Sequence, residues 1–64
     1  METAKEHIEL ATHSIIVIER FINVCKNLND VHGQRHWEIQ RQVYVDQREY
    51  YRSLLRQKEK INAG

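Results

Sequence analysis

The sequence predicts an all-α protein, a helical hairpin of two long antiparallel helices that dimerises into a four-helix bundle. Apolar residues recur at three- and four-residue spacing in two stretches, a pattern typical of amphipathic helices. A segment rich in Asn, Asp and Gly separates the stretches, and the 64 residues contain no proline. We expect one domain over residues 1–64, with a helix at about 3–29, a turn at about 29–33 and a helix at about 33–62.

The first helix is expected to begin at a capping box. The Thr3 hydroxyl can accept a hydrogen bond from the N–H of Glu6, whose carboxylate can accept one from the N–H of Thr3. The apolar side chains that follow cover about half of the helix circumference, which favours a bundle of three or more helices over a two-helix seam. The predicted oligomer core on this helix is Ile8, Ile15, Ile18, Phe21, Ile22 and Cys25, and Leu10, Val17, Val24 and Leu28 flank it.

The break between the helices is predicted from residues that tolerate turns. Asn and Gly accept the left-handed conformation that closes a helix, and Asp30 is a suitable N-cap for the helix that follows. Short connections between helices place the two helices antiparallel. We therefore expect the turn to end near Gly33 and the two helices to pack side by side.

The second helix is expected to carry three zones along its length. The core edge, assigned to the oligomer core, consists of Ile39, Val43, Tyr50, Leu54 and Ile61. The aromatic edge consists of Trp37, Tyr44, Tyr51 and Leu55. The arginine stripe consists of Arg41, Arg48, Arg52 and Arg56. These three zones supply the candidate contact residues of the helix.

The size of the chain favours self-association. A core built from about 60 residues rarely supplies more than roughly 3–5 kcal/mol, and small proteins usually add a disulfide, a metal or an oligomeric partner. The single cysteine, Cys25, excludes an internal disulfide. A homo-oligomer is the expected solution.

No pattern in the sequence predicts catalysis or a cofactor. Cys25 is expected near a helix C-terminus, where the helix dipole disfavours the reactive thiolate. His32 and His36 share a helical face four residues apart, but zinc requires three or four ligands. We therefore expect a non-enzymatic protein without a metal site, and keep a dimer bridged by Cys25, His32 and His36 as the weakest alternative.

The predicted function is that of a small regulatory or adaptor protein that acts through protein–protein contacts. The aromatic edge would supply the anchors and the arginine stripe the polar rim, because Trp, Tyr and Arg are enriched at binding hot spots. The alternative is a nucleic-acid-binding dimer in which the arginine stripe contacts phosphates. In architecture alone the chain resembles small plasmid- or phage-type helical-hairpin regulators.

Neither a signal peptide nor a membrane anchor is expected. The chain starts without a basic leader, and no stretch approaches the roughly 20 apolar residues that span a bilayer. The net charge of +1 does not by itself indicate a nucleic-acid or membrane partner. We expect a cytoplasmic protein.

Overall fold

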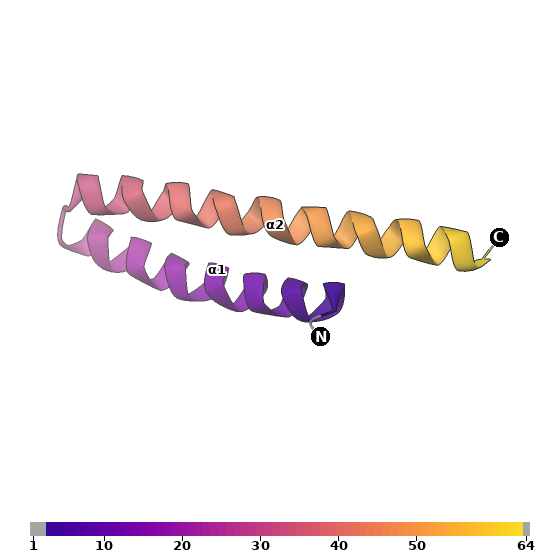
Figure 1. The fold of residues 1–64 in the computed structure, drawn as a ribbon. Coiled ribbons are helices and arrows are strands. Elements are labelled where there is room, and N and C mark those ends of the chain that lie inside the picture. Colours follow the sequence, from indigo (N-terminus) through magenta and orange to yellow (C-terminus); the bar gives the residue numbers. More distant parts are fainter. Residues whose placement is uncertain (1–2, 64) are drawn as a thin grey trace.

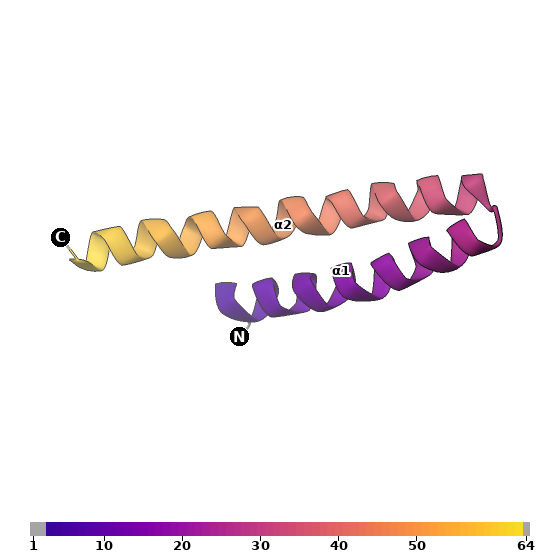
Figure 2. The ribbon, with the colours of Figure 1, turned by 180° about the vertical axis from the view of Figure 1, so that it is seen from behind.

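The computed structural model is an antiparallel helical hairpin and confirms the predicted all-α fold (Figure 1). It describes the backbone of residues 3–63 and the side chains of residues 3–58. Helix α1 spans Ala4–Asn27 and helix α2 spans Val31–Ala63. The two helices pack along the length of α1, and α2 continues past the N-terminus of α1, as the view from behind also shows (Figure 2). The hairpin measures 52 × 17 × 15 Å.

The N-terminus of α1 has the predicted capping box. The backbone N–H of Glu6 donates to the Thr3 Oγ1 at 3.2 Å, and the backbone N–H of Thr3 donates to the Glu6 Oε2 at 3.3 Å. Thr3 has an extended backbone, as an N-cap residue requires. These two bonds satisfy backbone donors that a helix start leaves without an intrahelical partner.

The C-terminus of α1 closes in a Schellman motif. Asn29 has a φ of 56°, the left-handed conformation that asparagine tolerates better than most residues. The N–H of Asp30 donates to the carbonyl of Cys25 at 2.8 Å, and the N–H of Asn29 donates to the carbonyl of Lys26 at 3.2 Å. The two bonds satisfy carbonyls of the last turn and reverse the chain direction within three residues.

Asp30 is the N-cap of α2, as predicted, but Gly33 does not belong to the turn. The Oδ1 of Asp30 accepts from the N–H of Gly33 at 3.0 Å, so α2 begins at Val31 and Gly33 lies in its first turn. A Cβ at position 33 would clash with the Asp30 carboxylate and lie 3.0 Å from the Cys25 Sγ. The glycine therefore provides room for the cap and for close packing of α1, rather than a helix break.

The hairpin core is thin. Among the described residues only four side chains are buried, and all of them belong to α1: Ala11, Ile15, Ile18 and Ile22. They recur at spacings of four, three and four residues, so they form one stripe along the side of α1 that faces α2. The residues of α2 opposite them are at best half-buried. Two helices alone do not enclose a larger core.

Candidate interaction face

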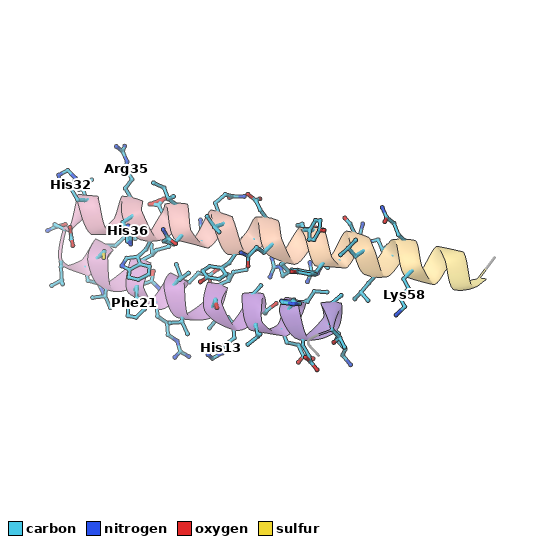
Figure 3. All side chains as sticks on the ribbon, viewed as in Figure 1. His13, Phe21, His32, Arg35, His36 and Lys58 are labelled. Carbon is cyan, nitrogen blue, oxygen red and sulfur yellow. The ribbon has the colours of Figure 1, made fainter. Side chains whose placement is uncertain are left out.

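The aromatic edge of α2 packs against α1 of the same chain. Trp37, Tyr44, Tyr51 and Leu55 are all half-buried. The Trp37 ring stacks on Phe21 with centroids 4.8 Å apart, and the Tyr51 ring stacks on His7 with centroids 4.3 Å apart and planes only 5° from parallel. Figure 3 shows Phe21 pointing from α1 toward α2, while His32 and Arg35 point away from α1. The residues predicted to anchor a partner therefore pack within the hairpin itself.

The core edge of α2 is exposed. Ile39, Val43, Tyr50 and Leu54 are all exposed, although each is large and apolar. Ile61, the fifth member, has its side chain outside the described residues. We refer to the four described residues as the α2 row. Their exposure in a single chain is what an oligomer core would show before assembly, so the prediction that they form such a core stays open.

A second apolar row runs along α1 beside the buried stripe. The α1 row consists of Leu10, Val17, Phe21, Val24 and Leu28. Val17 is half-buried, and the others are between 45% (Phe21) and 72% (Leu28) exposed. Positions 10, 14, 17, 21, 24 and 28 alternate spacings of four and three residues, which is the heptad pattern of a helix-packing seam. From the sequence we assigned Phe21 to the oligomer core and the other four residues to its flanks. Their spacing alone, however, identifies a seam.

The two rows lie on the same side of the hairpin. At 100° per residue, the α1 row is displaced by about 110° from the buried stripe, and the α2 row is displaced by a similar angle from the aromatic edge. Because the helices are antiparallel, these displacements lead to the same side. An open groove of about 380 Å³ between the helices confirms that the two rows share a side. It is lined by Val17 and Phe21 of the α1 row and by Gln40, next to the α2 row.

We call this surface, formed by the α1 row, the α2 row and the groove between them, the interaction face. The polar residues within it are His13, Ser14 and Gln40, which line the groove, and Gln47, which lies between Val43 and Tyr50 along the α2 row. None of the described residues in either row or in the groove is Asp, Glu, Lys or Arg. An apolar surface without Asp, Glu, Lys or Arg inside it is typical of a protein-contact surface.

The arginine stripe lies on the other edge of α2. Arg41, Arg48 and Arg52 are displaced by roughly 120–200° from the α2 row at 100° per residue. Arg52 pairs with Glu49 at 3.2 Å, and both groups are largely exposed. Arg48 is half-buried, and its Nε–H has no hydrogen-bond partner among the described residues. The stripe therefore does not border the interaction face. The sequence-based prediction that it forms the polar rim of this contact surface does not fit that position.

The proposed metal ligands do not form a site within one chain. Cys25 is half-buried against Gly33, whereas His32 and His36 are exposed. His36 instead makes an edge contact with the neighbouring Trp37 ring, with centroids 5.0 Å apart. In the part of the chain that the structure describes, no three His, Cys, Asp or Glu side chains lie close enough together to hold a metal ion.

Two further findings are not tied to a single group of residues. Within the described residues, neither helix combines the length and the apolar character that crossing a membrane requires. No protein-family model, curated protein or solved structure matches the sequence or the fold of this chain.

Proposed function

We propose that the protein is a non-enzymatic regulator or adaptor that acts through protein–protein contacts, as the protomer of a homodimeric four-helix bundle. The observation that carries the proposal is the interaction face, a continuous apolar surface contributed by both helices. Four-helix bundles are built from hairpins that each present one such face to the other pair of helices. The thin core of the hairpin supports the same conclusion, because further burial has to come from another chain.

The surface area of the chain supports the proposal of a partner. It exposes 5340 Å², whereas a globular monomer of 7.7 kDa exposes about 4,300 Å². The excess of about 1,000 Å² is close to the ~800 Å² that each partner buries in a stable protein interface. The radius of gyration of 15.3 Å likewise exceeds the ~11 Å of a compact 64-residue domain. A second hairpin packed on the interaction face would widen the molecule across its short dimensions and make it more compact.

The charge distribution is suited to a second copy. A surface that meets its own copy brings like groups close together, so any charge inside it would repel. Among the described residues the interaction face contains no Asp, Glu, Lys or Arg; His13, at the edge of the groove, is its one ionisable side chain besides the tyrosines. A strongly charged partner is therefore not indicated for this face.

The concentration dependence of thermal unfolding tests the proposal. The melting temperature of a dimer rises with protein concentration, whereas that of a monomer does not. We expect this rise for the unmodified chain and its loss in Val43→Glu, which places a charge in the middle of the α2 row. Ile16→Glu is the matched control, because Ile16 is 47% exposed, close to the 45% of Val43, and lies on the polar side of α1. Equal behaviour of the two variants would refute the role of the face.

Nucleic-acid binding through the arginine stripe is a second proposal with narrower support. The stripe stays outside the interaction face and is therefore accessible in the dimer, and Arg56 is exposed. Base stacking on the aromatic edge is not part of it, since Trp37 and Tyr51 stack on α1. Binding of a labelled DNA duplex that weakens steeply between 50 and 200 mM salt, as phosphate contacts require, would support it. Absence of binding at low salt would exclude it.

A further inference from the structure

We propose that His32 and His36 make the dimer sensitive to pH, so that the two copies separate when both imidazoles gain a proton. This inference rests on the proposed dimer and adds a regulator of its association. Histidine is the side chain that ordinarily changes its charge between pH 5 and 8, which is why proteins use it as a switch in this range. The position of the pair, the charges around it and its coverage by a second copy support the proposal.

The two histidines continue the α2 row toward the turn, beyond the residues that define the interaction face. His32 precedes Tyr50 by 18 residues, and His36 precedes Leu54 by the same number. A stretch of this length makes five full turns of an α-helix, so each histidine lies on the same side of α2 as its counterpart in the row. Both are exposed, and Figure 3 shows them at the turn end of the hairpin.

A second copy that covers the interaction face also covers the pair. The α1 row reaches Leu28, the C-cap residue of α1, so the face extends to the turn on the side of α1. His32 and His36 occupy the corresponding end on the side of α2, in its first two turns. A partner that buries the α1 row up to Leu28 therefore takes the neighbouring imidazoles out of water, whichever end of the partner lies against the turn.

On α2, no carboxylate is spaced to pair with either histidine. Side chains three or four residues apart on a helix are neighbours. Besides the histidines themselves, these positions of α2 hold Gly33, Arg35, Ile39 and Gln40. Glu38 instead accepts a hydrogen bond from Gln34 at 3.0 Å. Protonation would therefore place two positive charges on one face of the helix, next to the positive charge of Arg35.

The last turn of α1 and the connection contribute three titratable groups, Cys25, Lys26 and Asp30. Thiols are mostly uncharged in this pH range. Lys26 lies about 170° from the α1 row at 100° per residue. The Asp30 carboxylate caps α2 by accepting from the N–H of Gly33 at 3.0 Å. All three groups are present in the single chain too, so they act on the pair before and after association.

The second copy brings no compensating charge of its own. Among the described residues its interaction face contains no Asp, Glu, Lys or Arg, only tyrosines and His13 as ionisable groups, and its histidine pair would carry the same positive charge. In the single chain, water solvates the protonated imidazoles, whereas burial of an unpaired charge in the dimer is costly. Association is therefore strongest where imidazole is neutral, and it is lost as the pH falls through the range of imidazole titration.

Sedimentation equilibrium of the full-length chain at pH 8 and pH 5 tests the proposal. A chelator in all samples excludes a metal bridge through the same histidines. We expect the dissociation constant of the dimer to rise at least about tenfold toward pH 5, which corresponds to ~1.4 kcal/mol, with the helical signal unchanged. An equal dissociation constant at both pH values would overturn the proposal, and so would loss of the helical signal in place of dissociation.

A neutral double variant assigns the response to the pair. The variant His32→Gln, His36→Gln has polar side chains that stay uncharged at both pH values, and it retains His7 and His13. We expect it to dimerise with nearly the same dissociation constant at pH 8 and pH 5. If the constant rises as much as in the unmodified chain, other groups cause the response and the proposal is wrong.

A permanently charged variant tests coverage of the pair. We expect His32→Lys, His36→Lys to weaken the dimer already at pH 8. The matched control is Asn23→Lys, Asn27→Lys, because these asparagines are also exposed and four residues apart but lie on the polar side of α1. Equally strong dimers of the two lysine variants would show that the pair is not covered and would overturn the proposal. A mass near 7.7 kDa for the unmodified chain at pH 8 would overturn the proposed dimer itself.

Discussion

Phe21 and Trp37 connect the inside of the hairpin to its interaction face. Their rings stack with centroids 4.8 Å apart and planes 26° from parallel. Phe21 is 45% exposed and belongs to the α1 row, whereas Trp37 is half-buried, and both line the open groove. The pair is therefore shared between folding of the chain and its proposed assembly.

The Phe21–Trp37 stack should show measurable coupling. Stacked aromatic pairs contribute about 0.5–1.5 kcal/mol beyond the area that they bury. We expect Phe21→Leu and Trp37→Leu each to lower the free energy of unfolding, and the double variant to lose less than the sum of the two by about that amount. Chemical denaturation at one fixed protein concentration measures the cycle. Strict additivity would show that the two rings do not interact.

Removal of the N-terminal cap should destabilise the hairpin modestly. Thr3→Ala deletes the hydroxyl that accepts from the N–H of Glu6, and such changes cost about 1 kcal/mol. Thr3→Ser keeps the acceptor and serves as the control. Thermal unfolding should show a lower melting temperature for the alanine variant only. Equal melting temperatures of the two variants would mean that the cap does not contribute to stability.

The left-handed residue of the turn should discriminate sharply among substitutions. Asn29 has a φ of 56°, a conformation that costs L-residues other than Asn, Asp and Gly about 1–2 kcal/mol. Asn29→Gly should therefore retain or raise the free energy of unfolding, and Asn29→Ala should lower it by about 1 kcal/mol. Urea denaturation of both variants measures the difference. A stabilising effect of alanine would contradict the observed turn.

Gly33 offers a test of the close contact at the start of α2. Glycine to alanine within an exposed helix usually stabilises by about 1 kcal/mol. Here the added methyl group would displace the Asp30 carboxylate, which caps the helix, and press on the Cys25 Sγ. We expect Gly33→Ala to give no gain in the free energy of unfolding. A gain of the usual size would show that the cap and Cys25 move aside at no cost.

Local signals in the sequence were sufficient to predict the hairpin. The capping box at Thr3, the cap at Asp30 and the helical spacing of the apolar residues each depend on neighbours within a few positions. The extent of α2 was less predictable at its start, because Gly33 suggests a break when its contacts with Asp30 and Cys25 are unknown. Signals of this kind define the elements of the fold but not their mutual orientation.

The orientation of α2 could not be predicted in the same way. Both the aromatic edge and the core edge are apolar, and the spacing of the apolar residues does not indicate which of them packs on α1. The choice depends on long-range pairs, Phe21 with Trp37 and His7 with Tyr51, which exist only at one register of the two helices. The α1 row was visible as a heptad, yet its meaning depended on knowing which side α2 covers.

Sedimentation equilibrium of the unmodified chain at low micromolar concentration shows whether another copy covers the interaction face. We expect a species of about 15.4 kDa, twice the chain mass of 7.7 kDa, with the helical signal of the folded hairpin. A single, fully folded species near 7.7 kDa across the concentration range would contradict it.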